Sequence, residues 1–210
     1  AFKPPGGCIT LHGFLRILPP EVCFRYSIYN GHPGLITKYP ELKGKDPQAK
    51  VWNSGINYNY HGHVIHKVVS EVDAGTVASV VYFYNKDIKK ECESLDNYIK
   101  RLHDVSVNNW VAFLKKKITL NNTSFYGQFM DKNYKVAICG AHSQGKTTLV
   151  NALKQKAYLS SELKFSYNTN LTRNISKLLP INEDGNSASQ YLIMSRHLEF
   201  ALTPGRIILD

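Results

Sequence analysis

Residues 134–148 read YKVAICGAHSQGKTT, and this stretch predicts the fold class of the chain. Its first six residues form a short apolar run, typical of a buried strand. Residues 140–147 match the pattern G-x-x-x-x-G-K-[ST], and apolar residues then recur with helical spacing from Lys146 to about Tyr158. Strand, glycine loop and helix in this order predict an α/β architecture with a parallel sheet flanked by helices.

The glycine loop has the composition of a phosphate-binding loop. Its glycines let backbone N–H groups and the start of the following helix hold phosphate oxygens. Lys146 would reach the β- and γ-phosphates, and the hydroxyl of Thr147 would ligate Mg²⁺. We therefore expect ATP and Mg²⁺ as cofactors. The expected contact residues are Gly140, Ala141, His142, Ser143, Gln144, Gly145, Lys146, Thr147 and Thr148.

Residues 206–210 read RIILD, an apolar strand run that ends in a carboxylate. This form is typical of the Walker B strand, whose aspartate holds Mg²⁺ or takes a proton from the acceptor. We expect Lys146 and Asp210 to be catalytic, and Thr147 and Asp210 to ligate the metal. The alternative is an aspartate that caps a helix or is simply solvated.

The segment from Val136 to Asp210 resembles the P-loop ATPase and kinase group that includes nicotinamide riboside kinase domains and phage-encoded nucleotide or nucleic-acid kinases. The resemblance rests on the loop GAHSQGKTT, on Arg173, on the run LPINEDG at 179–185 followed by Gln190, and on RIILD. It implies that Arg173 and Gln190 bind substrate. It covers about 75 of the 210 residues.

Two departures from that family pattern stand out. The family commonly has an acidic residue three positions before the arginine, where this sequence has Asn170. The chain also stops at Asp210, where the family continues with further strands and an arginine-bearing lid. The resemblance therefore implies an incomplete kinase domain, or a degenerate or split one.

The rest of the chain has a different texture. Aromatic and β-branched runs predict strands at 8–18, 22–29, 34–39 and 76–84, separated by Pro- and Gly-rich turns. Apolar residues at three- and four-residue steps predict a helix over 86–117, interrupted near 107–109. We expect a β-rich α+β domain over 1–132 and a P-loop nucleotide-binding domain over 133–210.

The composition indicates which partners and which cellular compartment to expect. With 26 Lys and Arg against 16 Asp and Glu, the net charge of +10 favours polyanionic partners. No stretch approaches the roughly 18 apolar residues of a membrane span. Four cysteines without a CxxC pair predict reduced thiols and a cytoplasmic protein.

Two side-chain groups outside the loop have alternative readings. His61, His63 and His66 have no acidic or cysteine residue at close spacing, so we interpret them as strand or surface histidines rather than metal ligands. Lysines in 86–117, with nearby aromatic residues, fit a nucleic-acid surface. A solvated helix face over an aromatic core fits them better.

The sequence thus predicts an enzyme, an ATP- and Mg²⁺-dependent phosphotransferase that acts on a nucleoside, a nucleotide or a nucleic-acid end. A nucleic-acid-stimulated ATPase and a non-catalytic nucleotide-binding module stay open as alternatives. The expected partners are a nucleotide and, less specifically, nucleic acid, with no membrane. The oligomeric state is not indicated.

Overall fold

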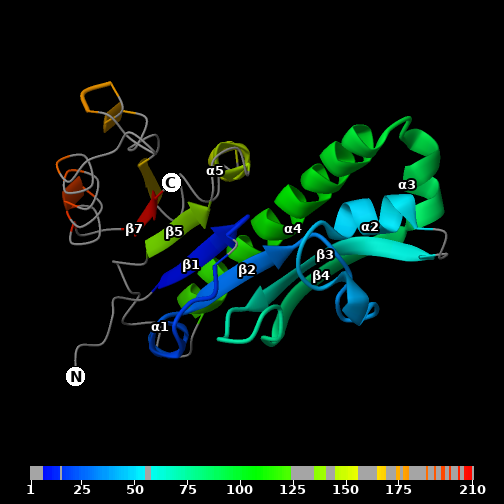
Figure 1. The fold of residues 1–210 in the computed structure, drawn as a ribbon. Coiled ribbons are helices and arrows are strands. Elements are labelled where there is room, and N and C mark those ends of the chain that lie inside the picture. Colours follow the sequence, from blue (N-terminus) through cyan, green and yellow to red (C-terminus); the bar gives the residue numbers. More distant parts are fainter. Residues whose placement is uncertain are drawn as a thin grey trace.

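The computed structural model describes most of residues 7–168 and short pieces beyond them. The described residues are 7–14, 16–54, 58–123, 135–140, 145–155, 165–168, 174–175, 177–179, 188, 192, 195–196, 199, 203 and 206–209. Both helices and strands occur along this part of the chain (Figure 1). In chain order they are β1 (Gly7–His12), α1 (Pro20–Arg25), β2 (Ile28–His32), the 3₁₀ helix η1 (Pro40–Leu42), α2 (Pro47–Asn53), β3 (Tyr60–Lys67), β4 (Val77–Tyr84), α3 (Asn85–Glu91), α4 (Leu95–Thr123), β5 (Lys135–Gly140), α5 (Lys146–Lys154), β6 (Phe165–Asn168) and β7 (Arg206–Leu209).

The strands form one mixed sheet of seven strands in the order β4-β3-β2-β1-β5-β7-β6. At its centre β1 runs parallel to both neighbours, with Ile9 opposite Ile28 of β2 and opposite Ala137 of β5. β7 and β6 extend the parallel part, whereas β3 and β4 run antiparallel. The predicted α/β class is confirmed. The predicted boundary near residue 132 lies outside the described residues, and the division into two domains stays a prediction.

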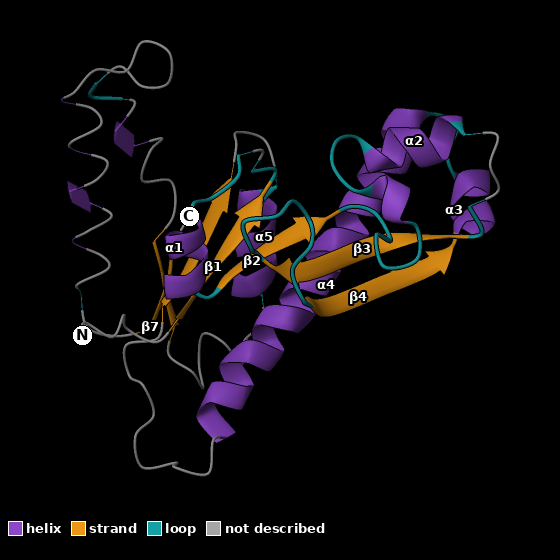
Figure 2. Ribbon diagram, turned by 60° about the horizontal axis from the view of Figure 1, so that its bottom comes forward, coloured by secondary structure: helices purple, strands orange, loops and turns teal. Residues whose placement is uncertain are grey.

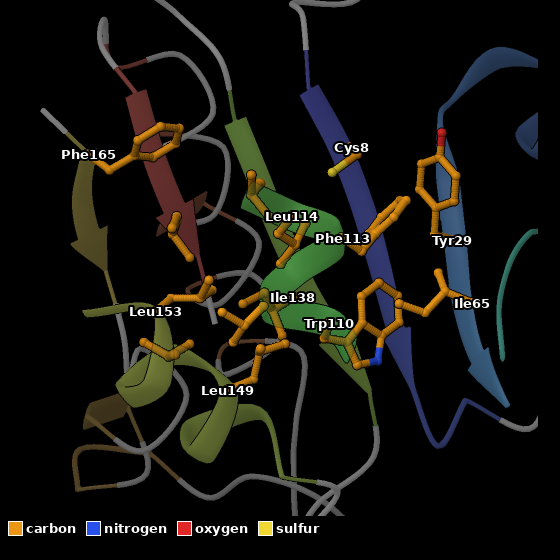
Figure 3. Close-up of a cluster of buried hydrophobic side chains, with 14 residues drawn as sticks. Cys8, Tyr29, Ile65, Trp110, Phe113, Leu114, Ile138, Leu149, Leu153 and Phe165 are labelled. Atoms are coloured by element: carbon orange, nitrogen blue, oxygen red, sulfur yellow. The ribbon is translucent and has the colours of Figure 1, made fainter. Parts of the chain in front are cut away.

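The long helix α4 lies across one face of the sheet, and α5 packs beside it (Figure 2). In α4, Tyr98, Leu102, Trp110 and Leu114 recur at four-residue steps or multiples of them and are buried, as a helix that covers a sheet requires. Trp110, Phe113 and Leu114 of α4 meet Leu149 and Leu153 of α5 over the middle strands (Figure 3). Burying each of these side chains contributes about 1.5 to 3 kcal/mol. This core fixes the middle strands against the helices.

A second core holds the segment that follows β2. Leu35 and Ile36 after the strand, Leu42 of η1 and Val51 of α2 are buried together with Val64 of β3. Leu42 and Val51 are fully buried. Because these side chains anchor η1, the backbone of Leu42 is fixed beside the end of β2.

Several predicted elements differ from the structure. The predicted strand 22–29 is instead α1 followed by the start of β2. Pro20 in the first turn, with Glu21 beside it, favours a helix start. The predicted strand 34–39 forms turns, because Leu35 and Ile36 are buried against neighbouring segments without joining the sheet.

The helical region differs in detail as well. The single helix predicted over 86–117 is two helices, α3 and α4, and α4 continues without a break through 107–109. β5, the start of α5 and β7 lie where strands and a helix were predicted. None of the described helices has both the length and the apolar composition that a membrane span requires.

A glycine lets β2 approach α4 closely. A Cβ atom on Gly31 would lie 2.7 Å from Nε2 of His63 and 2.7 Å from Nε1 of Trp110. Both atoms belong to buried rings, which have little room to move. Glycine at this position therefore sets the distance between β2 and the helix layer.

Replacing Gly31 by alanine should lower the free energy of unfolding by about 1 to 3 kcal/mol, because the added methyl group overpacks the ring pair. Urea unfolding measures the change. Ile17→Ala is the matched control, since that side chain is 67% exposed and its loss should change stability by no more than about 0.5 kcal/mol. A Gly31→Ala protein as stable as the unchanged one contradicts the close approach.

Three of the buried histidines are held neutral. Burial is the main cause that lowers the pKa of His12 to about 4, of His61 to about 4 and of His63 to about 3. Lys146 and His103 lower the pKa of His12 further. In the unfolded chain each of these rings binds a proton once the pH falls below the ordinary pKa of histidine, about 6.5.

The free energy of unfolding should therefore fall as the pH drops from about 6.5 to about 4. The slope is roughly 1.4 kcal/mol per pH unit for each of the three histidines, because the unfolded state binds protons that the folded state does not. Urea unfolding at a series of pH values measures it.

His63→Gln should flatten the slope by about one histidine's share. Lys45→Gln, at an exposed side chain, should leave it unchanged. An unchanged slope in the His63→Gln protein would show that His63 is protonated in the folded state.

Candidate functional site

A polar cluster lies where the parallel strand β2 ends. Asn30 and His32 stand two residues apart on this strand, so their side chains point to the same face of the sheet. Ligand sites in sheets of this kind form at the carboxyl ends of the parallel strands. The end of β2 at His32 is therefore where a functional site is expected.

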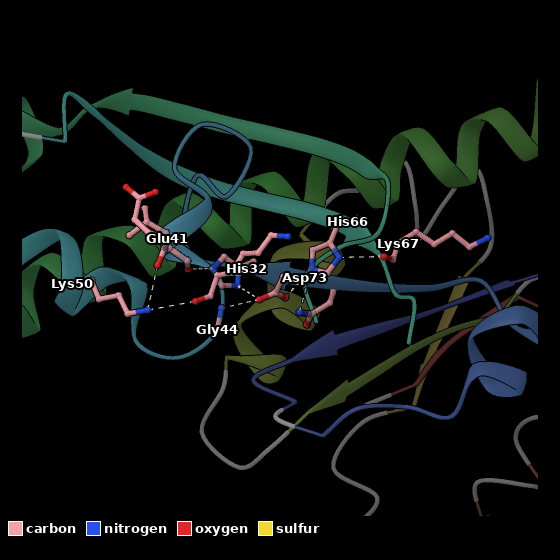
Figure 4. A network of polar contacts seen from close by, with 10 residues as sticks. His32, Glu41, Gly44, Lys50, His66, Lys67 and Asp73 are labelled. Carbon is pink, nitrogen blue, oxygen red and sulfur yellow. Dashed lines mark hydrogen bonds and ion pairs between the residues drawn. The ribbon is translucent and has the colours of Figure 1, made fainter. Parts of the chain in front are cut away.

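Asp73, in the turn between β3 and β4, completes the cluster (Figure 4). Its Oδ2 lies 3.2 Å from Nδ1 of His32, and its Oδ1 lies 3.3 Å from Nε2 of His66. The backbone N–H of Gly44 donates a hydrogen bond of 3.0 Å to Oδ2. The side chains of His32, His66 and Asp73 are at most 8% exposed. One buried carboxylate thus joins two histidines from neighbouring strands.

Backbone carbonyls fix which ring nitrogens carry protons. Nε2 of His32 lies 2.8 Å from the carbonyl oxygen of Leu42, and Nδ1 of His66 lies 3.1 Å from that of Lys67. A carbonyl oxygen only accepts, so each of these nitrogens must be an N–H donor. The other nitrogen of each ring faces a carboxylate oxygen of Asp73. The cluster thus places one carboxylate between two oriented imidazoles.

The electrostatics of Asp73 agree with that geometry. Burial alone would raise the pKa of Asp73, but hydrogen bonds from His32, His66 and the backbone of Gly44 outweigh it and hold the pKa well below its ordinary value. The residue also has a φ of 49°, in the left-handed region that aspartate tolerates better than most side chains. A strained backbone that places an ionised carboxylate between two histidines is characteristic of a functional site.

Asn30 extends the cluster with an amide. Its Nδ2 lies 3.5 Å from Nε2 of His66, and the side chain is only half-buried. A fixed amide beside an imidazole supplies hydrogen bonds to oxygen atoms that gain negative charge in a reaction. Together Asn30, His32 and Asp73 can donate protons, accept protons and stabilise an oxyanion.

The residues that the sequence singled out lie elsewhere on the same sheet edge. Gly140 ends β5 opposite His12, and Gly145 has a φ of 75°. Lys146 begins α5, and its Nζ donates a hydrogen bond of 3.1 Å to the carbonyl oxygen of Gly140. Thr147 and Thr148 are exposed.

The other predicted site residues fall outside the part of the chain that the structure describes. They are Ala141, His142, Ser143, Gln144, Arg173, Gln190 and Asp210. The described residues therefore do not test whether Lys146 lies near Asp210, Arg173 or Gln190. A binding role for these residues stays a prediction.

Sequence reasoning missed Asn30, His32 and Asp73, and it treated His66 only as a member of a histidine triplet. The run Asn30-Gly31-His32-Pro33-Gly34 reads as turn material, and so does Asp73-Ala74-Gly75. The available signal was a polar pair at i and i+2 directly after the apolar residues Ile28 and Tyr29. In the described residues no group of three potential ligands is arranged to hold a metal ion.

Comparison with known proteins shows a family match for the segment that contains this cluster. Residues 6–114, about half of the chain, match the family model described as Formyl transferase, and Asn30, His32, His66 and Asp73 all lie within the match. A comparison with curated proteins finds no match.

Solved structures show a partial likeness. Phosphoribosylglycinamide formyltransferase from Streptococcus pneumoniae is 26% identical, with 52% of this chain and 57% of that chain covered and a TM-score of 0.44. The enzyme of the same name from Bacillus halodurans is 21% identical, with 56% and 58% covered and a TM-score of 0.46. For that from Campylobacter jejuni the values are 25%, 47%, 47% and 0.38. The chain thus spans about half the length of these structures, and the family assignment rests on the family model.

The predicted P-loop kinase is wrong. The resemblance that led to it begins near residue 134 and depends on a short loop, whereas the family match covers residues 6–114 and the buried cluster within them. ATP and Mg²⁺ as cofactors, Walker A chemistry, ATPase activity and a nucleotide-binding module are wrong with it, because the family transfers formyl groups rather than phosphoryl groups. The broader expectation of a transferase enzyme agrees with the match. The chain belongs to the formyl transferase family.

Proposed function

We propose that this protein transfers a formyl group from a nitrogen of a formyl donor to an amine, with Asn30, His32 and Asp73 carrying out the chemistry. The observation that carries the proposal is the buried contact of 3.2 Å between His32 and Asp73 at the end of β2, inside the segment that matches the family. Acyl transfer to an amine needs proton movement and oxyanion stabilisation, and this cluster offers both.

The reaction moves one bond and one proton. The amine nitrogen of the acceptor attacks the formyl carbon, and the carbonyl oxygen becomes an oxyanion. The bond from that carbon to the donor nitrogen then breaks. The proton that leaves the attacking nitrogen is matched by one delivered to the departing nitrogen, so the balance needs no further reactant.

The side chains divide this work by their positions. Asn30 and His32 point to the same face of β2, so the half-buried amide of Asn30 can donate an N–H to an oxyanion beside the imidazole. Asp73 orients the ring of His32 through the 3.2 Å contact with Nδ1. His66 holds the second carboxylate oxygen and keeps Asp73 in place.

The substrates follow from the family at the level of chemical class. A folate that carries the formyl group on nitrogen is the donor we propose, and a primary amine is the acceptor. The related structures include enzymes named for phosphoribosylglycinamide and for formyltetrahydrofolate. These two compounds are therefore the substrates to test first.

Purified protein should convert formyltetrahydrofolate and phosphoribosylglycinamide to the formylated amine and tetrahydrofolate. His32→Ala should lower kcat/KM roughly 100- to 1,000-fold, because it removes a proton-transfer group. Asp73→Asn should lower it by at least about 100-fold, since the ring of His32 loses the carboxylate that orients it. Mass spectrometry of the product and the absorbance change of the folate measure both.

Glu91→Gln is the control, because Glu91 lies on α3 and is exposed, with its carboxylate 3.9 Å from Arg101. Its activity should match that of the unchanged protein. Absence of formyl transfer with any amine acceptor, in a protein shown to be folded, would refute the proposal. So would a His32→Ala protein with full activity.

A further inference from the structure

One buried histidine next to the site is held in an unusual way. His61 of β3 is fully buried, and its Nε2 lies 3.1 Å from the carbonyl oxygen of Pro33. That carbonyl only accepts, so the proton is on Nε2 and Nδ1 carries a bare lone pair. Among the described residues, Nδ1 of His61 is the buried side-chain nitrogen or oxygen that has no hydrogen-bond partner.

The surroundings of the ring are apolar. The ring of Phe83 stacks on His61 at 6.1 Å between centroids, with an angle of 19° between the planes. The ring of Tyr98 meets it edge-on at 5.7 Å. Burial lowers the pKa of His61 to about 4, so the ring is neutral near pH 7. Since an apolar side chain would fill this space without burying an unpaired nitrogen, packing alone does not account for a histidine here.

The contact to Pro33 lies directly beside the reacting histidine. Pro33 follows His32, and the ladder between β2 and β3 ends at the pair His32 and Val64. Past that pair, the hydrogen bond from His61 continues to tie the β2 strand end to β3. The carbonyl held at 3.1 Å belongs to the Pro33–Gly34 peptide, so this contact fixes the backbone one residue past His32. Because the ring of Pro33 fixes its φ, the constraint passes to the His32–Pro33 peptide and so to the backbone that carries the imidazole.

Two other contacts hold the His32 ring itself. Its Nε2 is held by the carbonyl of Leu42 in η1, and its Nδ1 by Asp73 in a turn. Both partners belong to connecting segments, whereas His61 belongs to a strand inside the sheet. Among the hydrogen bonds described for Pro33, the one from His61 links the backbone that follows His32 to a strand of the sheet.

We propose that His61 is a positioning residue for formyl transfer: its Nε2–H holds the Pro33 carbonyl and thereby fixes the orientation of His32 toward Asp73. This inference rests on the proposed function. It assigns His61 no contact with substrate and no proton transfer.

His61→Leu in the full chain should lower kcat by roughly 10- to 100-fold, with KM changed by less than about threefold, because a small misplacement of a reacting group slows the chemical step. The midpoint of urea unfolding should change little, since leucine removes an unpaired buried nitrogen, which offsets the loss of the hydrogen bond to Pro33. His61→Gln keeps an N–H that can reach Pro33, so its kcat should stay within about threefold of the unchanged protein. His61→Met serves as a second apolar replacement.

Phe83→Leu is the matched control. It removes the ring that stacks on His61 and leaves the hydrogen bond to Pro33 in place. Its unfolding midpoint should fall while its kcat holds, the reverse of His61→Leu. A purely structural role of His61 would instead make the His61→Leu and Phe83→Leu proteins behave alike.

A readout that does not depend on activity separates this inference from the proposed function. The ¹⁵N signals of the His32 ring should shift in His61→Leu and stay in place in His61→Gln. A shift without formyl transfer in any form of the protein refutes the function and supports the positioning role.

Three outcomes would overturn the positioning role. The first is full kcat in both the His61→Leu and the His61→Met protein. The second is unchanged His32 ring signals in both. The third is a loss of kcat that His61→Gln does not restore.

Discussion

The carboxylate of Asp73 is the interaction on which the site depends. Its two oxygens face His32 of β2 and His66 of β3, and a backbone N–H from Gly44 closes the contact. Three segments meet at this one group: the end of a parallel strand, the end of an antiparallel strand and the loop that follows η1. Without the carboxylate, two imidazoles would face each other in a buried space. Asp73 therefore holds both histidines in place and also supplies the negative charge of the cluster.

Much of the sheet could be predicted from the sequence. Apolar runs located β1, β4, β5 and β7, and helical periodicity located most of α4. The failures occurred where tertiary packing overrode local preference. Residues 22–29 are rich in aromatic and β-branched side chains, yet Pro20 starts a helix there. Leu35 and Ile36 look like strand residues, but they fill a core from a turn.

The site could not be predicted from the sequence, for a different reason. Asn30 and His32 stand among Gly and Pro, which indicates a turn, and Asp73 stands in a second turn far along the chain. Only the pairing of β2 with β3 brings His66 opposite Asn30 and so gives Asp73 its two partners. The glycine loop at 140–147 is instead a contiguous motif that can be recognised in the sequence. It therefore dominated the prediction over residues that come together only in the folded sheet. The histidines of β3 gave a weaker indication of the site. This strand is buried on both faces, and a run of polar side chains in the sequence does not predict such burial.

The place of β1 bears on how the chain is made. This strand, near the N-terminal end of the sequence, is completed on one side by β2 and on the other by β5, as in the contact between Thr10 and Ala137, which are 127 positions apart. A ribosome releases the first strand long before the last of its two neighbours. Until residues 135–140 emerge, one edge of β1 has open backbone donors and acceptors next to the nascent site. Such an edge invites pairing with other chains, so the time spent in translation between β2 and β5 is a period of exposure to aggregation.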